Sequence, residues 1–117
     1  MPKKVLIVDD ELEFTNDLAK GLEIFGYKAY KAGDGDSALN LIEKIRPDIV
    51  LCDYVLPDID GDAVLKKAKE KYHDLTFIML TAYYDEKIEK KLKQLGAAHV
   101  IYKPITLTAL EELLKGY

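Results

Sequence analysis

Three aspartates follow two short apolar runs that have the length of buried strands. Asp9 and Asp10 come directly after residues 5–8, and Asp53 comes directly after residues 49–52. Because the carboxyl ends of neighbouring parallel strands meet at one edge of a sheet, we expect the three carboxylates to converge where open α/β folds bind ligands. Carboxylates about 4 Å apart repel each other by roughly 4 kcal/mol per pair at an effective dielectric of about 20. The spacing therefore predicts a group that compensates this charge.

A hydroxyl and an ammonium group follow two further apolar runs. Thr81 comes after residues 77–80, and Lys103-Pro104 comes after residues 100–102. Mg²⁺ is a natural partner for the acids, because it takes carboxylates together with water and phosphate oxygens. Lys103 or a shared proton could balance part of the charge without a metal, and a buried salt-bridge cluster is the purely structural alternative. A carboxylate beside Mg²⁺, a lysine and a hydroxyl has the groups needed for phosphoryl transfer to an aspartate.

The sequence contains no glycine-rich motif of the kind that holds nucleotide phosphates. It has no G-x-x-x-x-G-K-[ST] segment, and Asp9-Asp10-Glu11 stands where a dinucleotide-binding chain has a glycine-rich turn. An acidic turn would also repel a flavin phosphate. The net charge of −4 argues against nucleic-acid binding, which requires a concentrated basic face. We therefore do not expect this domain to bind a nucleotide, a flavin or a nucleic acid.

Apolar runs alternate with segments of helical period along the chain, which predicts repeated βα units. The predicted strands are 4–9, 27–32, 48–53, 76–81 and 99–103. The second of them is interrupted by lysines and is expected at an edge of the sheet. These features favour a single-domain, three-layer α/β/α sandwich of the flavodoxin-like class, with a five-stranded parallel sheet in the order 2-1-3-4-5 and five helices.

Apolar stripes and stop signals indicate where the helices lie. The first stripe contains Phe14, Leu18, Leu22 and Phe25, and Gly26 is placed to end that helix. The 117 residues correspond to one domain, 1–117. The chain has neither the apolar run of a membrane span nor the pattern of a signal peptide, so we expect a cytoplasmic protein without membrane contact.

The motifs, taken in order, resemble the receiver domain of two-component response regulators, of the chemotaxis-regulator type, over residues 3–115. The matching features are the acidic pair Asp9-Asp10, the phosphoacceptor Asp53, the loop 53–61 that ends in Asp60-Gly61, the pair Thr81-Ala82, and Lys103-Pro104. Five matches in sequence order, each at a predicted strand end, form a specific pattern.

The resemblance implies a role for each matched residue. Asp53 would accept a phosphoryl group from a sensor histidine kinase or phosphotransfer protein, with Thr81 and Lys103 completing the catalytic set. Phosphoryl oxygens would be bound by Thr81, Lys103 and the Ala82 amide. Mg²⁺ would be held by Asp53, by Asp10 directly, by Asp9 directly or through water, and by the backbone carbonyl of Val55. The family's Lys-Pro peptide bond is usually cis, whereas an ordinary trans turn proline is the alternative for Pro104.

The chain departs from the receiver pattern at the position of the switch aromatic. Many receivers carry an aromatic residue three positions before the lysine, and here that position is Val100. Tyr102 precedes Lys103 directly, and strand alternation places positions 100 and 102 on the same face. Either Tyr102 has taken over the readout of Thr81, or the switch works without an aromatic side chain. Val55 and Tyr83 occupy the positions that tune phosphoryl lifetime in the family, and their apolar bulk predicts a long-lived aspartyl phosphate.

The expected function is a phosphorylation-controlled switch in a phosphorelay, rather than an enzyme that turns over a substrate. The responsive surface would be the fourth helix, fifth strand and fifth helix, with Tyr83, Tyr84, Tyr102, Leu107 and Leu110 available for a downstream protein, a fused output domain or a homodimer. A haloacid-dehalogenase-type phosphatase is a rival, but it would need an acid at the position of Val55 and a capping insertion. The other alternative is a pseudo-receiver, a protein-binding module that phosphorylation does not control.

Overall fold

The central strands are apolar at almost every position because both of their faces are covered. The computed structural model describes residues 2–117. Five strands in this part of the chain form one parallel sheet in the order β2-β1-β3-β4-β5. The strands are β1 (Lys4–Val8), β2 (Lys28–Ala32), β3 (Ile49–Asp53), β4 (Thr76–Thr81) and β5 (His99–Tyr102). The predicted strand order and fold class are confirmed, and the lysine-bearing second strand does lie at an edge.

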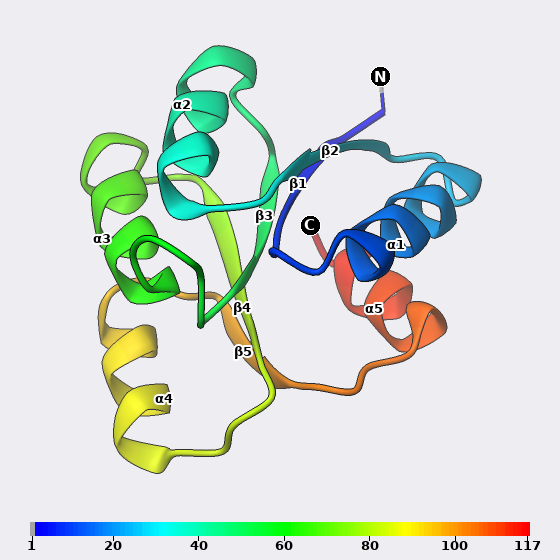
Figure 1. The fold of residues 1–117 in the computed structure, drawn as a ribbon. Helices are drawn as coiled ribbons and strands as arrows, with labels where there is room; N and C mark the ends of the chain where they lie inside the picture. The colour runs from blue at the N-terminus through cyan, green and yellow to red at the C-terminus, as the bar shows by residue number, and fades with distance from the viewer. Residues whose placement is uncertain (1) are drawn as a thin grey trace.

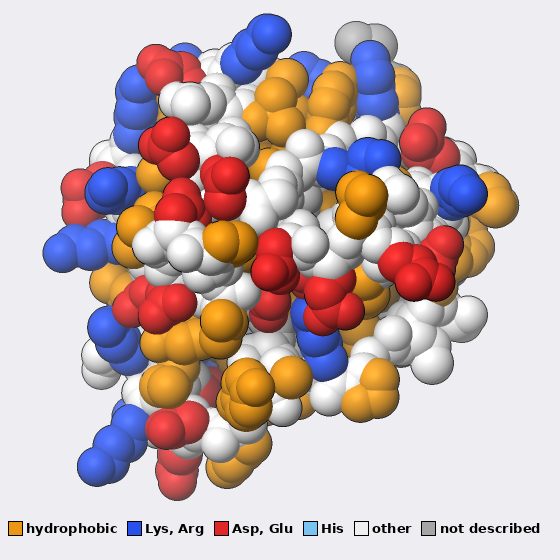
Figure 2. Space-filling view, viewed as in Figure 1, with side chains coloured by type: hydrophobic (Ala, Val, Ile, Leu, Met, Phe, Trp, Pro, Cys, Tyr) orange, Lys and Arg blue, Asp and Glu red, His pale blue; other side chains and the backbone are white. Residues whose placement is uncertain are grey.

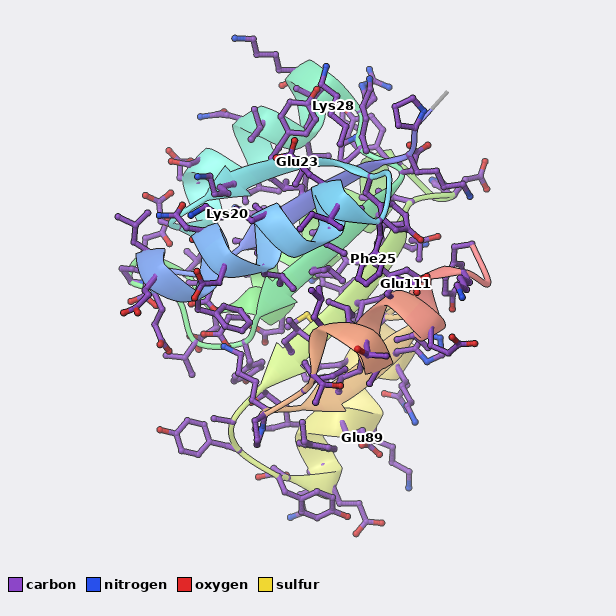
Figure 3. The ribbon with its side chains drawn as sticks, turned by 90° about the vertical axis from the view of Figure 1, so that its right-hand side faces the viewer. Lys20, Glu23, Phe25, Lys28, Glu89 and Glu111 are labelled. Atoms are coloured by element: carbon purple, nitrogen blue, oxygen red, sulfur yellow. The ribbon has the colours of Figure 1, made fainter. Side chains whose placement is uncertain are left out.

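Helices cover both faces of this sheet (Figure 1). They are α1 (Leu12–Ile24), α2 (Gly35–Ile45), α3 (Gly61–Lys71), α4 (Glu86–Gln94) and α5 (Leu107–Leu114). The helices α2, α3 and α4 pack on one face, and α1 and α5 lie side by side on the other (Figures 1 and 3). Within residues 2–117, no helix combines the length and the apolar character that crossing a membrane requires.

The alternation of side chains along each strand divides the core into two layers. Leu6, Val50 and Phe77 point toward α2, α3 and α4. Their neighbours Ile7 and Leu51 point toward α1 and α5. All five of these side chains are fully buried, so the sheet is a rigid support for the residues at its edges.

Short polar side chains start three of the helices by accepting hydrogen bonds from free backbone amides of the first turn. Asp34 accepts from the Ser37 amide at 2.7 Å in α2, Asp85 from the Lys87 amide at 2.9 Å in α4, and Thr106 from the Ala109 amide at 3.1 Å in α5. The chain leaves α1 through Gly26, which has a φ of +96° that favours glycine. This confirms the predicted stop of the first helix.

Two predicted details of the core are wrong. Phe25 lies beyond the last turn of α1 (Figure 3) and is 44% exposed, because the helix ends at Ile24 and the chain turns at Gly26 into β2. Leu110, expected on the surface for partners, is fully buried against β1, β3 and α1, and Leu107 packs beside Gly21 of α1. Of that expected surface, Tyr83 and Tyr84 remain well exposed, each more than 70%, whereas Tyr102 is partly buried.

Candidate functional site

The ends of β1 and β3 bring the three predicted acids together. Val8 of β1 is paired with Cys52 of β3, so Asp9 and Asp53 occupy matching positions one residue further along the two strands. Asp10 follows Asp9 directly, and one carboxylate oxygen from each of the three residues lies within 4.8 Å of the others. The chain crosses to opposite sides of the sheet after β1 and β3, which opens a crevice between these strands.

Asp9 is buried, and both of its carboxylate oxygens already have partners. One oxygen accepts a hydrogen bond from the Glu11 amide at 2.9 Å, and the other from Lys103 Nζ at 2.7 Å. The side chain is only 1% exposed, so these interactions replace the water that it loses. In this arrangement, Asp10 and Asp53 are the carboxylates of the cluster that solvent can reach.

Lys103 reaches the acids from the end of β5, which is two strands away from β3. Its ammonium lies 2.7 Å from Asp9 and 3.6 Å from Asp53, and 4.6 Å from the centre of the Phe14 ring. Burial lowers the pKa of Lys103, but the hydrogen bond to Asp9 and the attraction of both carboxylates outweigh this effect and raise it overall. The lysine therefore carries its charge at neutral pH. The Lys103-Pro104 peptide bond is cis, as in the family that the motifs resemble.

One lysine does not compensate three carboxylates. The pKa of Asp53 is raised to about 6, chiefly because the carboxylate is partly buried; the Lys103 ammonium lowers it in part, and the charges of Asp9 and Asp10 add to the rise. An ionised Asp53 is thus unfavourable until more positive charge arrives. The donor set consists of hard carboxylate oxygens, which suit Mg²⁺. The residues present therefore fit a divalent cation.

A crevice of about 230 Å³ opens beside this cluster. It is lined by Asp10, Glu11, Asp53, Val55, Ala82, Tyr83 and Lys103. Acidic side chains gather at the centre of this face of the molecule, with a basic side chain beside them (Figure 2). The opening can admit a small anionic group only if cationic partners offset the charge of the acids.

Thr81 does not line the crevice, in contrast to Asp53, Ala82 and Lys103, the other residues predicted to bind the phosphoryl group. It ends β4 and is buried, and its hydroxyl accepts a hydrogen bond from the Tyr83 amide at 3.1 Å. Ala82, the next residue, is exposed at the crevice. Thr81 itself is therefore not part of the crevice lining in this structure.

Tyr102 and Val100 lie on the same face of β5, as strand alternation predicts, and this face is turned toward α4. The Tyr102 hydroxyl donates a hydrogen bond to Glu89 of α4 at 2.6 Å, and its ring lies 5.2 Å from the Tyr84 ring. The hydrogen bond to Glu89 and burial raise the pKa of Tyr102 to about 12. Val100 is half-buried against the core beneath α4. Tyr102 thus links the strand that carries Lys103 to α4, which is at the lower edge of Figure 3 with Glu89 labelled.

The glycine of the Asp60-Gly61 pair is needed for close packing at the start of α3. A Cβ atom on Gly61 would lie 2.5 Å from the carbonyl oxygen of Asp53 and 2.6 Å from Met79. The Gly61 amide donates to the Tyr54 carbonyl at 2.6 Å. The pair is therefore more than a turn, because Gly61 lets α3 begin directly against the backbone of Asp53.

The sequence did not single out Phe14 or Glu11 as parts of this site. Phe14 was assigned to the apolar stripe of the first helix, and its helical spacing gives no sign that the ring also contacts an ammonium group. Glu11 lines the crevice and its amide donates to Asp9. The position of Glu11 directly after Asp9-Asp10 was the signal that could have identified it as part of the site.

Comparisons with known proteins agree with this geometry. Residues 5–115 match the family described as the response regulator receiver domain. The chain is 33% identical over all its 117 residues to sporulation initiation phosphotransferase F of Bacillus subtilis (strain 168), covering 94% of that protein.

Solved structures show the same similarity at the level of the fold. A CheY-like receiver domain protein from Methanospirillum hungatei superposes with a TM-score of 0.96 at 30% identity, covering 99% of this chain and 93% of that one. The chemotaxis protein CheY4 of Vibrio cholerae superposes with a TM-score of 0.92 at 26% identity, covering 99% of this chain and 98% of that one.

Proposed function

This chain belongs to the response regulator receiver domain family, and from that premise we propose that Asp53 accepts a phosphoryl group from a sensor histidine kinase or phosphotransfer protein in a Mg²⁺-dependent reaction. Receiver domains are signalling switches, and we propose that residues 1–117 act as one. The observation that carries the proposal is the Asp53 carboxylate, which lies among Asp9, Asp10 and Lys103 with too little positive charge around it. A residue with a perturbed pKa in a crevice is a candidate for chemistry.

Asp10, Asp53 and the Val55 carbonyl would hold the Mg²⁺ ion, with Asp9 acting directly or through a bound water. When bound, the ion neutralises the carboxylates and screens the negative phosphoryl oxygens from them. We expect Asp9 to act through water, because its two carboxylate oxygens already accept hydrogen bonds from Lys103 and the Glu11 amide.

Asp53 would act as the nucleophile. One carboxylate oxygen attacks the phosphorus of a phosphohistidine, the O–P bond forms as the N–P bond breaks, and the electron pair of that bond returns to the histidine nitrogen. Ionised Asp53 is the reactive form, so positive charge that lowers its pKa also prepares it for attack.

Lys103 would bind a phosphoryl oxygen through its ammonium group, which already lies 3.6 Å from Asp53. Ala82 lines the crevice, and its amide would be a second donor. The Thr81 hydroxyl would become the third donor after leaving the Tyr83 amide. Donors fixed around the position of the transferred oxygens stabilise the charge that develops on them.

The rearrangement of Thr81 is the first step of the proposed switch. The β4–α4 connection, with Tyr83 and Tyr84, would move with Thr81 and disturb the contact between Tyr84 and Tyr102. Tyr102 and Val100 would then report the change on the α4-β5-α5 surface, where a downstream protein, an output domain or a second copy of the chain would bind. Full reversal from about 1:99 to about 99:1 requires about 5.5 kcal/mol of differential interaction.

The rival functions have less support. An aspartate-nucleophile phosphatase would need an acid at position 55, and the structure has half-exposed Val55 there. The comparisons do not support a pseudo-receiver.

Incubation with Mg²⁺ and acetyl phosphate, followed by intact mass measurement, tests the proposal. We expect one phosphoryl adduct that disappears in Asp53→Asn and persists in Asp60→Asn, a matched change seven residues further along the chain. Multiple turnover of a small phosphate ester would indicate the phosphatase instead. Absence of any adduct would indicate the pseudo-receiver.

A further inference from the structure

The segment between β3 and α3, residues 54–60, is a closed loop that we call the β3–α3 loop. The carbonyl of Tyr54 and the amide of Gly61 join its two ends at 2.6 Å. Leu56 turns inward and is buried in the core, whereas Val55 remains at the crevice. The loop is thus anchored at its base and on its inner side.

Asp58 provides a separate anchor at the outer end of the loop. Its two carboxylate oxygens accept hydrogen bonds from the Gly35 amide at 2.8 Å and the Asp36 amide at 2.9 Å. Both amides belong to the first turn of α2, where backbone N–H groups have no partner within the helix and the helix dipole favours negative charge. These amides hold the pKa of Asp58 down at about 2, so the carboxylate is ionised throughout the physiological range.

The contact between the loop and α2 also involves side-chain packing. Ile59 lies against Gly35, and a Cβ atom at Gly35 would overlap the Ile59 side chain. Helix α2 has its own N-cap in Asp34, which accepts from the Ser37 amide at 2.7 Å. Helix α2 is therefore capped without Asp58. The hydrogen bonds that Asp58 accepts connect this helix to the β3–α3 loop.

We propose that Asp58 is a positioning residue that ties the β3–α3 loop to α2 and thereby holds the Val55 carbonyl in place for Mg²⁺. This inference rests on the proposed function, in which Val55 supplies a metal ligand. Asp58 is three residues beyond Val55, and Pro57 between them has a restricted φ. A shift at Asp58 is therefore transmitted to Val55 over a short, stiff segment, whereas the other proposed ligands come from strand ends that do not depend on the loop.

A Mg²⁺ titration followed by backbone amide chemical shifts tests this role at about 0.15 M salt, where charges further apart than about 8 Å are largely screened. We expect Asp58→Ala to weaken Mg²⁺ binding about tenfold, as loss of an outer partner of a ligand commonly does. Asp58→Asn keeps one acceptor oxygen and loses the other, so it should weaken binding less than Asp58→Ala does, about threefold.

Two matched controls separate positioning from charge and from helix stability. Asp60→Asn removes the same charge from the same loop, and the Asp60 side chain makes no capping hydrogen bond. Asp34→Ala removes the cap of the same helix without touching the loop. Both controls should leave Mg²⁺ affinity within about twofold of the wild-type protein.

Hydrogen exchange of the metal-free protein gives a second measurement. In Asp58→Ala, the amides of residues 55, 56, 58 and 59 should exchange faster while the interior of α2 keeps its protection. If Asp58→Ala does not fold, the smaller change to Asn is used for both measurements.

The possible results distinguish this inference from the function on which it rests. Equal effects of Asp58→Ala and either control, or unchanged loop exchange, would overturn the positioning role and leave Mg²⁺ binding intact. A wild-type protein that binds no Mg²⁺ would overturn both.

Discussion

The amino ends and the carboxyl ends of the strands form two opposite edges of the sheet, which we call the amino edge and the carboxyl edge. Each edge has a cavity, and the larger cavity is at the amino edge, away from the acidic cluster. At the amino ends of β3 and β4, Arg46, Asp48, Lys71 and Tyr72 help to line a cavity of about 650 Å³. The crevice at the carboxyl ends measures only about 230 Å³. The size of a cavity therefore does not identify the edge that carries the acidic cluster.

The edges differ in how well their charges are compensated. At the amino edge, Arg46 stacks on the Tyr72 ring at 4.4 Å, Lys71 pairs with Glu43 at 3.0 Å, and Asp48 accepts from the Lys4 amide at 2.8 Å. At the carboxyl edge, three acids lie together, and two of them, Asp9 and Asp53, share Lys103. The comparison teaches that unfavourable, incompletely compensated charge marks a site for chemistry better than volume does.

Removing a cation should slow phosphorylation far more at the carboxyl edge than at the amino edge, and this is the largest effect that we expect. We expect Lys103→Met to slow phosphorylation by acetyl phosphate at least about 100-fold, because an ammonium that stabilises the transferred oxygens is lost. Arg46→Ala, which removes a cation at the amino edge, should change the rate less than about twofold. Time courses of intact mass in Mg²⁺ measure both rates, and similar losses in the two variants would refute the distinction.

In the metal-free protein, neutralising a carboxylate should raise stability at the carboxyl edge and lower it at the amino edge. The pKa of Asp53 is raised from 3.8 to about 6, so the folded state binds its proton more tightly than the unfolded state does. The resulting stabilisation is present below pH 4 and is lost as the pH rises through about 6. Asp53→Asn should therefore stabilise the protein at pH 7 by about 1–2 kcal/mol, a range that allows for screening by solvent.

Asp48→Asn should instead lower stability at pH 7, because that carboxylate has a favourable partner in the Lys4 amide. Urea unfolding in EDTA at pH 4 and pH 7 measures both effects, and the advantage of Asp53→Asn should shrink at pH 4. Added Mg²⁺ should stabilise the wild-type protein more than Asp53→Asn. A destabilised Asp53→Asn variant at pH 7 in EDTA would contradict the proposed charge imbalance.

The apolar rim of the carboxyl edge should control how long the phosphoryl group persists. Val55 is 49% exposed and Tyr83 is 71% exposed, and both line the crevice. Val55→Asn or Tyr83→Glu should speed hydrolysis about fivefold, equivalent to about 1 kcal/mol in the barrier, because a polar side chain there can guide water to the phosphorus. Decay of the phosphorylated mass after removal of acetyl phosphate gives the rates, and unchanged or slower decay would remove these residues from lifetime control.

The contact between Tyr102 and Glu89 should have the smallest effect, and the effect should appear away from the chemistry. Tyr102→Phe keeps the ring beside Tyr84 but loses the 2.6 Å hydrogen bond to α4. We expect about threefold faster amide exchange in α4 with phosphorylation rates unchanged. Tyr84→Phe, which keeps its ring contact, is the control. Equal exchange in the two variants would show that the hydrogen bond does not couple β5 to α4.

Much of the fold could be predicted because its signals are local. The apolar runs gave strands that agree with the structure to within one residue at each end, and Gly26 and Gly96 stop their helices with positive φ angles. Phe25 shows where this reasoning fails. Its spacing from Leu22 and Leu18 continues the buried stripe, yet the chain leaves the helix at that point and exposes the ring.

The charged centre of the candidate site was predictable, but Phe14, Glu11 and several of the contacts were not. From the sequence it follows that Asp9, Asp10, Asp53 and Lys103 meet at one edge, since parallel strands connected by helices must place their carboxyl ends together.

Three contacts are visible only in the folded protein: Lys103 bonds to Asp9, the Thr81 hydroxyl accepts from the Tyr83 amide, and Asp58 reaches α2. The first and third of these contacts join residues 94 and 23 positions apart in the chain. They depend on side-chain rotamers and on the packing distances between elements. Strand periodicity determines the face and the edge on which a residue lies, but it does not determine which neighbour its side chain selects.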